Sequence, residues 1–218
     1  MKINKTFIRN GVLGIVFFIV CVVASVGSCR YFDNHEGNDK YNYHIYRSRI
    51  ELAMEGTKDR IVSEVDSYID SIAPESGLNG IKLFELCDRY GVDVRFALAQ
   101  GEIESHFGTK GVAAKTNSVW NVKAYDGRTA NDMKKKGDHF SHPDHSIEPY
   151  LILLTTSYIT EDKSEEDMFI KFVNTNGKRY ASNPNYETMM LTVYNRINES
   201  TNLKQLLKDY KKYKMILM

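Results

Sequence analysis

Apolar side chains along this chain recur at helical intervals, which predicts a mainly helical protein. Such spacing, with steps of four or seven, runs through residues 46–72, and steps of three, one and three run through residues 83–90. A further helix is expected over residues 94–107, which end before Gly108. Gly91 follows the second segment as a natural helix stop, and Asp93 has the position of an N-cap for the third. We therefore expect two helices joined by a tight turn in this part of the chain.

The rest of the chain predicts further helices around a less regular middle. Residues 111–145 carry signals for loops and short strands only, and helical spacing resumes after the Ser146 cap. The expected fold is mainly α, of the α+β class, with an α-lobe and a small β or irregular lobe. We divide the chain into an N-terminal membrane segment (1–29), a tether with a helix (30–72), a domain (73–200) and a lysine-rich helix or tail (201–218). The helix over 46–72 is either a stalk or the first helix of the domain, and further helices are expected over 147–159, 165–173 and 184–197.

The N-terminal segment has the pattern of a membrane anchor. Lys2, Lys5 and Arg9 precede an uncharged run, residues 11–29, that is about long enough to cross the hydrocarbon core as a helix. Basic residues on that side predict a cytoplasmic N-terminus and a body outside the cytoplasm, in the cell envelope. The run ends in Val-Gly-Ser-Cys, which resembles a bacterial lipobox with Cys29 as the lipidated residue. An uncleaved signal anchor is the alternative.

Composition limits the classes of function. The 218 residues are 42% hydrophobic and 26% charged, which is typical of a globular domain. Lysine and arginine (29) balance aspartate and glutamate (28), so no basic excess is available to follow a phosphate backbone, and nucleic acid is not an expected partner. Three cysteines predict no disulfide framework, because Cys21 lies in the apolar run and Cys87 on an apolar helix face.

Two glutamates on the helix over 94–107 are candidates for chemistry. At about 100° per residue, Glu102 shares a polar stripe with Arg95 and His106, which predicts a solvated, charge-paired residue. Glu104 points about 160° away from Glu102 on the same helical wheel.

Small residues surround Glu104 on that wheel: Ala97, Gly101 and Gly108, with Gln100 alongside. They predict open space beside a partly desolvated carboxyl, whose pKa would be raised as a general acid for glycoside cleavage requires. A buried glutamate that bonds a loop or pairs with a cation is the alternative.

A family resemblance favours the acid. Ala-Gln-Gly-Glu-Ile-Glu-Ser-His-Phe-Gly-Thr, residues 99–109, resembles the AQAxLESGWGxS segment of bacterial and phage glucosaminidases, endo-β-N-acetylglucosaminidases that act on peptidoglycan. The catalytic acid of that family corresponds to Glu104. Residues 117–124 are similar to its NNLFGIKA strip, with Asn121 in place of glycine, and residues 146–150 to its SxEES strip. Residues 179–186 are similar to its GYATDPxY motif.

The resemblance implies a lysozyme-like α-lobe with substrate in a groove beside the small lobe, and peptidoglycan glycan strands as the partner. Tyr180 corresponds to the active-site tyrosine of the family. Trp120 and Tyr125 are candidates for stacking on a sugar, with core packing as the alternative for Trp120. Asn121 and Gln100 complete the expected substrate-binding set.

The second carboxylate is left open. Asp126, Asp132 and Asp138 lie in the middle stretch, and Asp126 follows the NVKAY strip most closely, although an N-acetyl group can replace a second acid in some glycosidases. Glu148 is expected to stabilise a helix N-terminus.

Other functions use different features. His139, His142 and His145 could hold a metal for a wall amidase or peptidase, but Pro143 interrupts any helix that would align them, and we expect neither a metal nor a cofactor. A muramidase, a lytic transglycosylase and a non-catalytic wall-binding protein are the remaining alternatives to the glucosaminidase.

Overall fold

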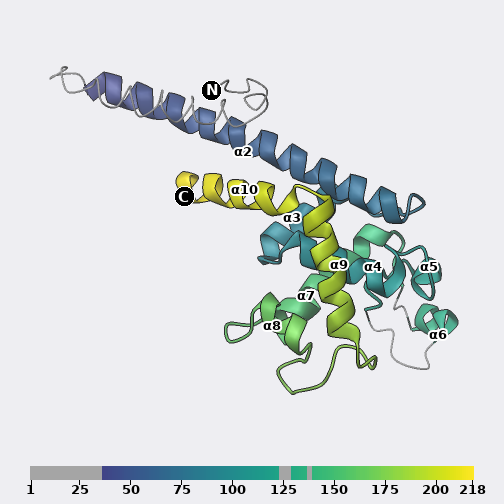
Figure 1. Ribbon diagram of the computed structural model, residues 1–218. Coiled ribbons are helices and arrows are strands. Elements are labelled where there is room, and N and C mark those ends of the chain that lie inside the picture. Colours follow the sequence, from purple (N-terminus) through teal and green to yellow (C-terminus); the bar gives the residue numbers. More distant parts are fainter. Residues whose placement is uncertain (1–35, 123–128, 137–138) are drawn as a thin grey trace, which may run out of the picture. The chain divides into compact units, whose positions relative to one another are not determined.

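The computed structural model describes residues 36–122, 129–136 and 139–218, and they are mainly helical (Figure 1). The expected membrane segment with Cys29, as well as Tyr125, Asp126 and Asp138, lies outside these residues. Among the residues described, no helix is long and apolar enough to span a membrane. The elements are α2 (Glu36–Ile72), α3 (Gly80–Tyr90), α4 (Val94–Ser105), α5 (Ala113–Thr116), α6 (Ala130–Lys135), the 3-10 helix η2 (Pro143–Ser146), α7 (Ile147–Ser157), α8 (Glu165–Ile170), α9 (Tyr186–Ser200) and α10 (Leu203–Leu217).

Helix α2 is longer than the sequence predicted. Residues 36–45, expected to be an irregular tether, are helical. The chain divides into two compact units at residues 49 and 50, so the second unit begins well before the predicted boundary at residue 73. The reason is that α2 buries Ile61, Val65 and Ile69 in the core of the second unit. The latter part of α2 is therefore a helix of the domain.

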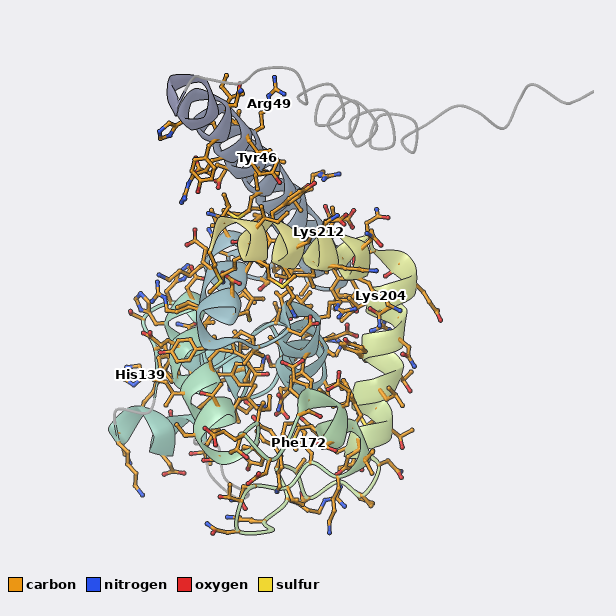
Figure 2. The ribbon with its side chains drawn as sticks, turned by 90° about the vertical axis from the view of Figure 1, so that its left-hand side faces the viewer. Tyr46, Arg49, His139, Phe172, Lys204 and Lys212 are labelled. Atoms are coloured by element: carbon orange, nitrogen blue, oxygen red, sulfur yellow. The ribbon has the colours of Figure 1, made fainter. Side chains whose placement is uncertain are left out.

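Helix α4 forms the centre of the second unit. Four consecutive residues, Phe96, Ala97, Leu98 and Ala99, are fully buried, so the helix is covered on all of its faces. Helix α9 packs along it, and α3 packs against α7. Figures 1 and 2 show α10 at one end of this unit and the loops around Phe172 toward the other.

The predicted turn between α3 and α4 is confirmed. Gly91 ends α3 in the left-handed conformation (φ 71°), and Asp93 Oδ1 accepts a hydrogen bond from the backbone N–H of Arg95 at 2.9 Å. Helix α4 ends two residues earlier than expected, because His106, Phe107 and Gly108 all have positive φ. This sharp turn returns the buried Phe107 ring to the α4 backbone, where it lies against Gly101.

The middle and the C-terminus also differ from expectation in part. In the described ranges there is no strand, only two isolated bridges, Thr160 with Lys163 and Val173 with Arg179. The described parts of the middle segment contain loops and the short helices α5, α6 and η2 in place of the expected strands. Within residues 201–218, α10 (Leu203–Leu217) buries Leu203, Leu206 and Leu207. Hydrophobic contacts thus make α10 a part of the second unit.

Candidate active site

Glu104 lies in the last turn of α4, where two side chains hold its carboxyl group. Tyr186, the first residue of α9, donates its hydroxyl to Oε1 at 2.5 Å. Asn121 donates Nδ2 to Oε2 at 3.0 Å and to the backbone oxygen of Glu104 at 2.9 Å. Glu104 is half-buried, so part of its side chain still reaches the surface. Both carboxyl oxygens therefore have a fixed donor.

The surroundings of Glu104 act on its pKa in opposite directions. Burial is the larger effect and raises the pKa, because desolvation disfavours the carboxylate. The hydrogen bonds from Tyr186 and Asn121 stabilise the carboxylate and lower the pKa. The net direction is upward, so Glu104 carries its proton at a higher pH than an exposed glutamate. Such a group can act as a proton donor.

A chain of buried hydrogen bonds fixes the tyrosine. Tyr150 donates its hydroxyl to Gln100 Oε1 at 2.8 Å, and Gln100 donates Nε2 to the Tyr186 hydroxyl at 3.1 Å. Burial and the nearby carboxyl of Glu104 raise the pKa of Tyr186 well above its ordinary value, so its hydroxyl stays protonated and remains a donor. Gln100 is fully buried. It therefore positions Tyr186, whereas the sequence predicted that it would bind substrate.

Tyr180 and Tyr186 belong to the same sequence block but have different contacts. Tyr180 donates its hydroxyl to the backbone oxygen of Trp120 at 3.1 Å and stacks on Phe172 and Tyr186, with ring centroids 4.8 and 5.8 Å away. The tyrosine that reaches Glu104 is Tyr186, which sequence reasoning missed. The sequence signal that could have identified Tyr186 is its position two residues after Pro184. A helix can begin there, and the first residue of that helix can face α4.

Trp120 is a core residue in this structure. Its side chain is fully buried, its ring stacks on Tyr150 with centroids 4.4 Å apart, and its indole N–H donates to the oxygen of Ala97 at 2.9 Å. The sugar-stacking prediction for Trp120 is therefore wrong, and the alternative of core packing describes it. The open space predicted beside Gly101 is also wrong. A Cβ there would lie 3.2 Å from the Trp120 indole nitrogen and 3.3 Å from the Phe107 ring.

Asn121 has an unusual conformation. Its φ is 50°, in the left-handed region that glycine adopts freely and that asparagine tolerates better than most residues. The residue at this position in the glucosaminidase strip that the sequence resembles is glycine, which explains why the backbone takes this shape. The asparagine adds a side chain that glycine lacks, and this side chain reaches Glu104.

Comparison with protein families decides the class. The model of the glucosaminidase family, described as mannosyl-glycoprotein endo-beta-N-acetylglucosaminidase, matches residues 82–199, which is more than half of the chain. The chain belongs to the glucosaminidase family. This glucosaminidase is therefore a glycoside hydrolase, and its substrate is a glycan. Searches among curated proteins and among solved structures gave no match.

The other glutamate of α4 in this glucosaminidase has a structural role. Glu102 is only 8% exposed, forms an ion pair with Arg196 of α9 and accepts the Tyr68 hydroxyl at 2.6 Å. The sequence predicted a charge-paired glutamate correctly but placed it in solvent. It is buried because α2 and α9 cover that face of α4. Glu102 thereby ties three helices together.

Two of the three clustered histidines of this glucosaminidase, His142 and His145, contact neighbouring side chains. His145 Nδ1 is 2.9 Å from the Ser141 hydroxyl, and His142 Nδ1 accepts a hydrogen bond from the backbone N–H of Asp144. Within the described part of the chain, no three His, Cys, Asp or Glu side chains form a group able to hold a metal ion. Among the candidates for a second carboxylate, Asp132 accepts two hydrogen bonds from Thr129.

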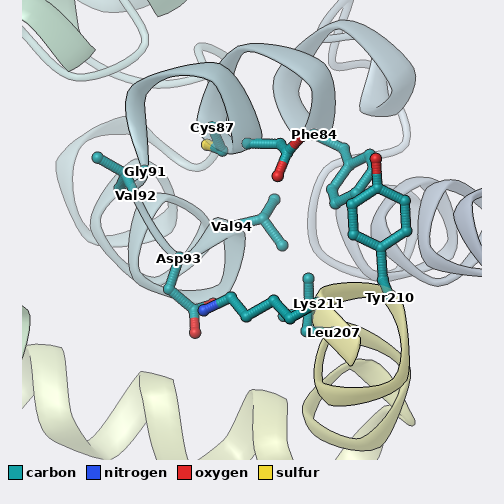
Figure 3. Close-up of a pocket in the computed structure, with 10 residues that line it drawn as sticks. Phe84, Cys87, Gly91, Val92, Asp93, Val94, Leu207, Tyr210 and Lys211 are labelled. Carbon is teal, nitrogen blue, oxygen red and sulfur yellow. The ribbon is translucent and has the colours of Figure 1, made fainter. Parts of the chain in front are cut away.

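A pocket at the other end of α4 is separate from these residues (Figure 3). It lies between α3, the start of α4 and α10, and Figure 3 shows Lys211 reaching across it toward Asp93. Ten residues along α4, or about 15 Å, separate Val94 in its wall from Glu104. Its lining is largely apolar, and Asp93 is already paired with Arg95. The pocket of the glucosaminidase thus lies away from the candidate acid.

Proposed function

We propose that this glucosaminidase hydrolyses peptidoglycan, cleaving the β-1,4 glycosidic bond after N-acetylglucosamine with Glu104 as the general acid. The observation that carries the proposal is the setting of Glu104: a half-buried carboxyl with a raised pKa, held by Tyr186 and Asn121 inside the matched span. Glu102 is a poor candidate because it is committed to an ion pair.

The hydrogen bonds to Glu104 fit the demands of acid catalysis. The protonated carboxyl delivers its proton to the leaving glycosidic oxygen while positive charge develops at the anomeric carbon. The carboxylate that results keeps the donors from Tyr186 and Asn121, and these bonds are strongest to an ionised acceptor. They therefore stabilise the acid more after it has given up its proton than before. Gln100 contributes by holding the Tyr186 hydroxyl in place.

The rest of the machinery is proposed from the sequence. Asp126 is the candidate second acid, with the N-acetyl group of the substrate as an alternative nucleophile. Tyr125 is the candidate sugar-stacking residue, and Tyr180 lies against Tyr186, where it supports the site. The substrate would lie between a lysozyme-like α-lobe and the irregular middle segment. The N-terminal apolar run would anchor the enzyme in the membrane, with the domain outside the cytoplasm.

Mass spectrometry of the fragments released from purified cell-wall sacculi tests the proposal. The full chain should release fragments with N-acetylglucosamine at the reducing end. N-acetylmuramic acid at that end would indicate a muramidase instead, and anhydro-muramic acid a lytic transglycosylase. Glu104→Gln should abolish release while sacculus binding remains. Glu148→Gln is the matched control, because Glu148 is exposed and bonds only the Tyr90 hydroxyl.

Unchanged release by Glu104→Gln would refute the acid assignment. Release that falls in the presence of a chelator would point to the histidine segment and a metal-dependent activity. Binding without release by the unmodified chain would support a wall-binding protein.

A further inference from the structure

The outer face of α10 carries a row of lysines. Lys204, Lys208 and Lys212 follow one another at steps of four, so they share one side of the helix, and all three are exposed (Lys204 and Lys212 are labelled in Figure 2). The opposite side buries Leu203 and Leu207 against the domain. We call these three residues the lysine stripe.

Within the part of the chain that the structure describes, the lysine stripe has no acidic partner. None of its three ammonium groups forms an ion pair with a described residue, whereas the neighbouring Lys214 pairs with Asp88 at 2.8 Å. Lys211 points away from the stripe, across the pocket toward Asp93 (Figure 3). Like charges four residues apart on a helix repel one another, so the stripe does not stabilise α10. An anionic partner would relieve this repulsion.

The stripe continues into exposed apolar residues. Met215 and Ile216 of α10 are 70% and 42% exposed, and Met218, which follows the helix, is 98% exposed. On a helical wheel, Met215 falls between Lys204 and Lys208, so basic and apolar groups occupy the same side. Water is an unfavourable environment for three neighbouring apolar side chains.

We propose that the lysine stripe and the apolar end of α10 bind the surface of a bilayer containing anionic phospholipids. Basic side chains beside exposed apolar ones are the pattern of helices that lie at the membrane interface, where lysines reach the phosphates and apolar groups enter the acyl boundary. An anionic polymer would satisfy the charge but would leave Met215 and Ile216 in water. The bilayer matches both kinds of side chain.

Docking through α10 would also orient the enzyme. Helix α9 extends from Tyr186, the partner of Glu104, to Ser200, where the chain turns into α10. Its fifteen residues span about 21 Å, so the stripe and the candidate acid lie near opposite ends of α9. A bilayer on α10 therefore leaves Glu104 on the side away from the lipid. The binding does not depend on which glycosidic bond the enzyme cleaves.

Amide hydrogen exchange of the full chain tests the binding. The protein is mixed with vesicles of phosphatidylcholine alone or of phosphatidylcholine with about one-third phosphatidylglycerol, and exchange is followed in peptides covering residues 203–218. Because the readout is confined to α10, binding by the N-terminal segment does not interfere. We expect slower exchange in α10 with the anionic vesicles only, and recovery of the faster rate at high salt.

The triple variant Lys204→Gln, Lys208→Gln, Lys212→Gln should lose this protection, since each lysine near an anionic surface favours binding by a factor of about five. The matched control removes the same charge elsewhere, with Lys82, Lys115 and Lys178, all exposed, changed to glutamine. The control should keep the protection. Equal exchange with both kinds of vesicle would overturn the proposal, and so would protection by purified wall polymer but not by lipid.

Discussion

The tyrosine that contacts the candidate acid offers the sharpest test of the site. Tyr186 is 4% exposed, so phenylalanine can fill the same space and only the hydroxyl is lost. The substitution removes the hydrogen-bond donor to Glu104 Oε1 and the hydrogen-bond acceptor for Gln100 Nε2. A hydrogen bond to a charged group contributes about 1.5–3 kcal/mol and a neutral one about 1 kcal/mol. We therefore expect Tyr186→Phe to lower the free energy of unfolding by about 2–4 kcal/mol when Glu104 is ionised.

The stability lost in Tyr186→Phe should be larger at high pH than at low pH. The pKa of Glu104 is raised in the folded protein, so this carboxyl favours folding at pH values below the ordinary pKa of glutamate, and the advantage disappears as pH rises through the folded value. Removing the Tyr186 donor raises the folded pKa further. The destabilisation should thus be about 1 kcal/mol near pH 4, where mainly the neutral bond to Gln100 is lost, and larger near pH 7.5.

Tyr180→Phe is the matched control. Its hydroxyl bonds only the backbone oxygen of Trp120, a neutral acceptor, so its removal should cost about 1 kcal/mol at both pH values. Urea unfolding at each pH measures the stabilities. The alkaline limb of the kcat/KM profile, which reports the acid of the free enzyme, should move to higher pH in Tyr186→Phe alone. Equal, pH-independent losses in the two variants would refute the assignment of Tyr186 as the residue that holds Glu104.

Two substitutions test the packing around the site. Gly101→Ala places a methyl group against the Trp120 and Phe107 rings and should destabilise the fold by about 1–3 kcal/mol. Gly56→Ala in α2 meets no atom within 4 Å and should stabilise it by up to about 1 kcal/mol, as thermal unfolding would show. Arg196→Met leaves the buried Glu102 without its cation and should cost about 1–2 kcal/mol, less than a fully buried pair because Arg196 is half exposed. Adding Glu102→Gln should recover most of that loss, and no recovery would contradict the ion-pair explanation.

The local signals in the sequence predicted the turn between α3 and α4 correctly. Gly91 and Asp93 act through their own backbone and side chain, so their roles as stop and cap follow from residue type and position. The structure separates the two glutamates of α4: Glu102 pairs with Arg196, whereas Glu104 keeps part of its surface and has no cationic partner among the described residues. The choice of Glu104 as the acid stays a prediction.

The helical wheel was misleading about the surroundings of α4. A wheel assigns the side of Glu102 to solvent, but α2 and α9 cover that face of α4 and bury Glu102. The wheel likewise shows small residues as open space, although Gly101 is small because a tryptophan ring occupies the position of its missing side chain. Which segments fill such space depends on tertiary contacts, and these leave no period in the sequence.

The pairing of Tyr186 with Glu104 could not be predicted for the same reason. The two residues are 82 positions apart, and their contact depends on how α9 packs along α4. The sequence block pointed to Tyr180, yet the rings of Tyr180 and Tyr186 stack on each other. Which of the two tyrosine hydroxyls faces the Glu104 carboxyl depends on where α9 begins and how it packs along α4.

The conformation of Asn121 is unfavourable by itself, but its side chain binds the carboxyl group of Glu104. The position holds a left-handed backbone, which strains any residue with a side chain, and the Asn121 Oδ1 atom is buried without a hydrogen-bond partner. Leaving such an acceptor unpaired costs about 1–3 kcal/mol. Glycine would avoid both costs, but it has no donor for Glu104 Oε2. The amide of Asn121 holds Oε2 of the carboxyl while Tyr186 holds Oε1, so the residue that carries these local costs also restrains Glu104.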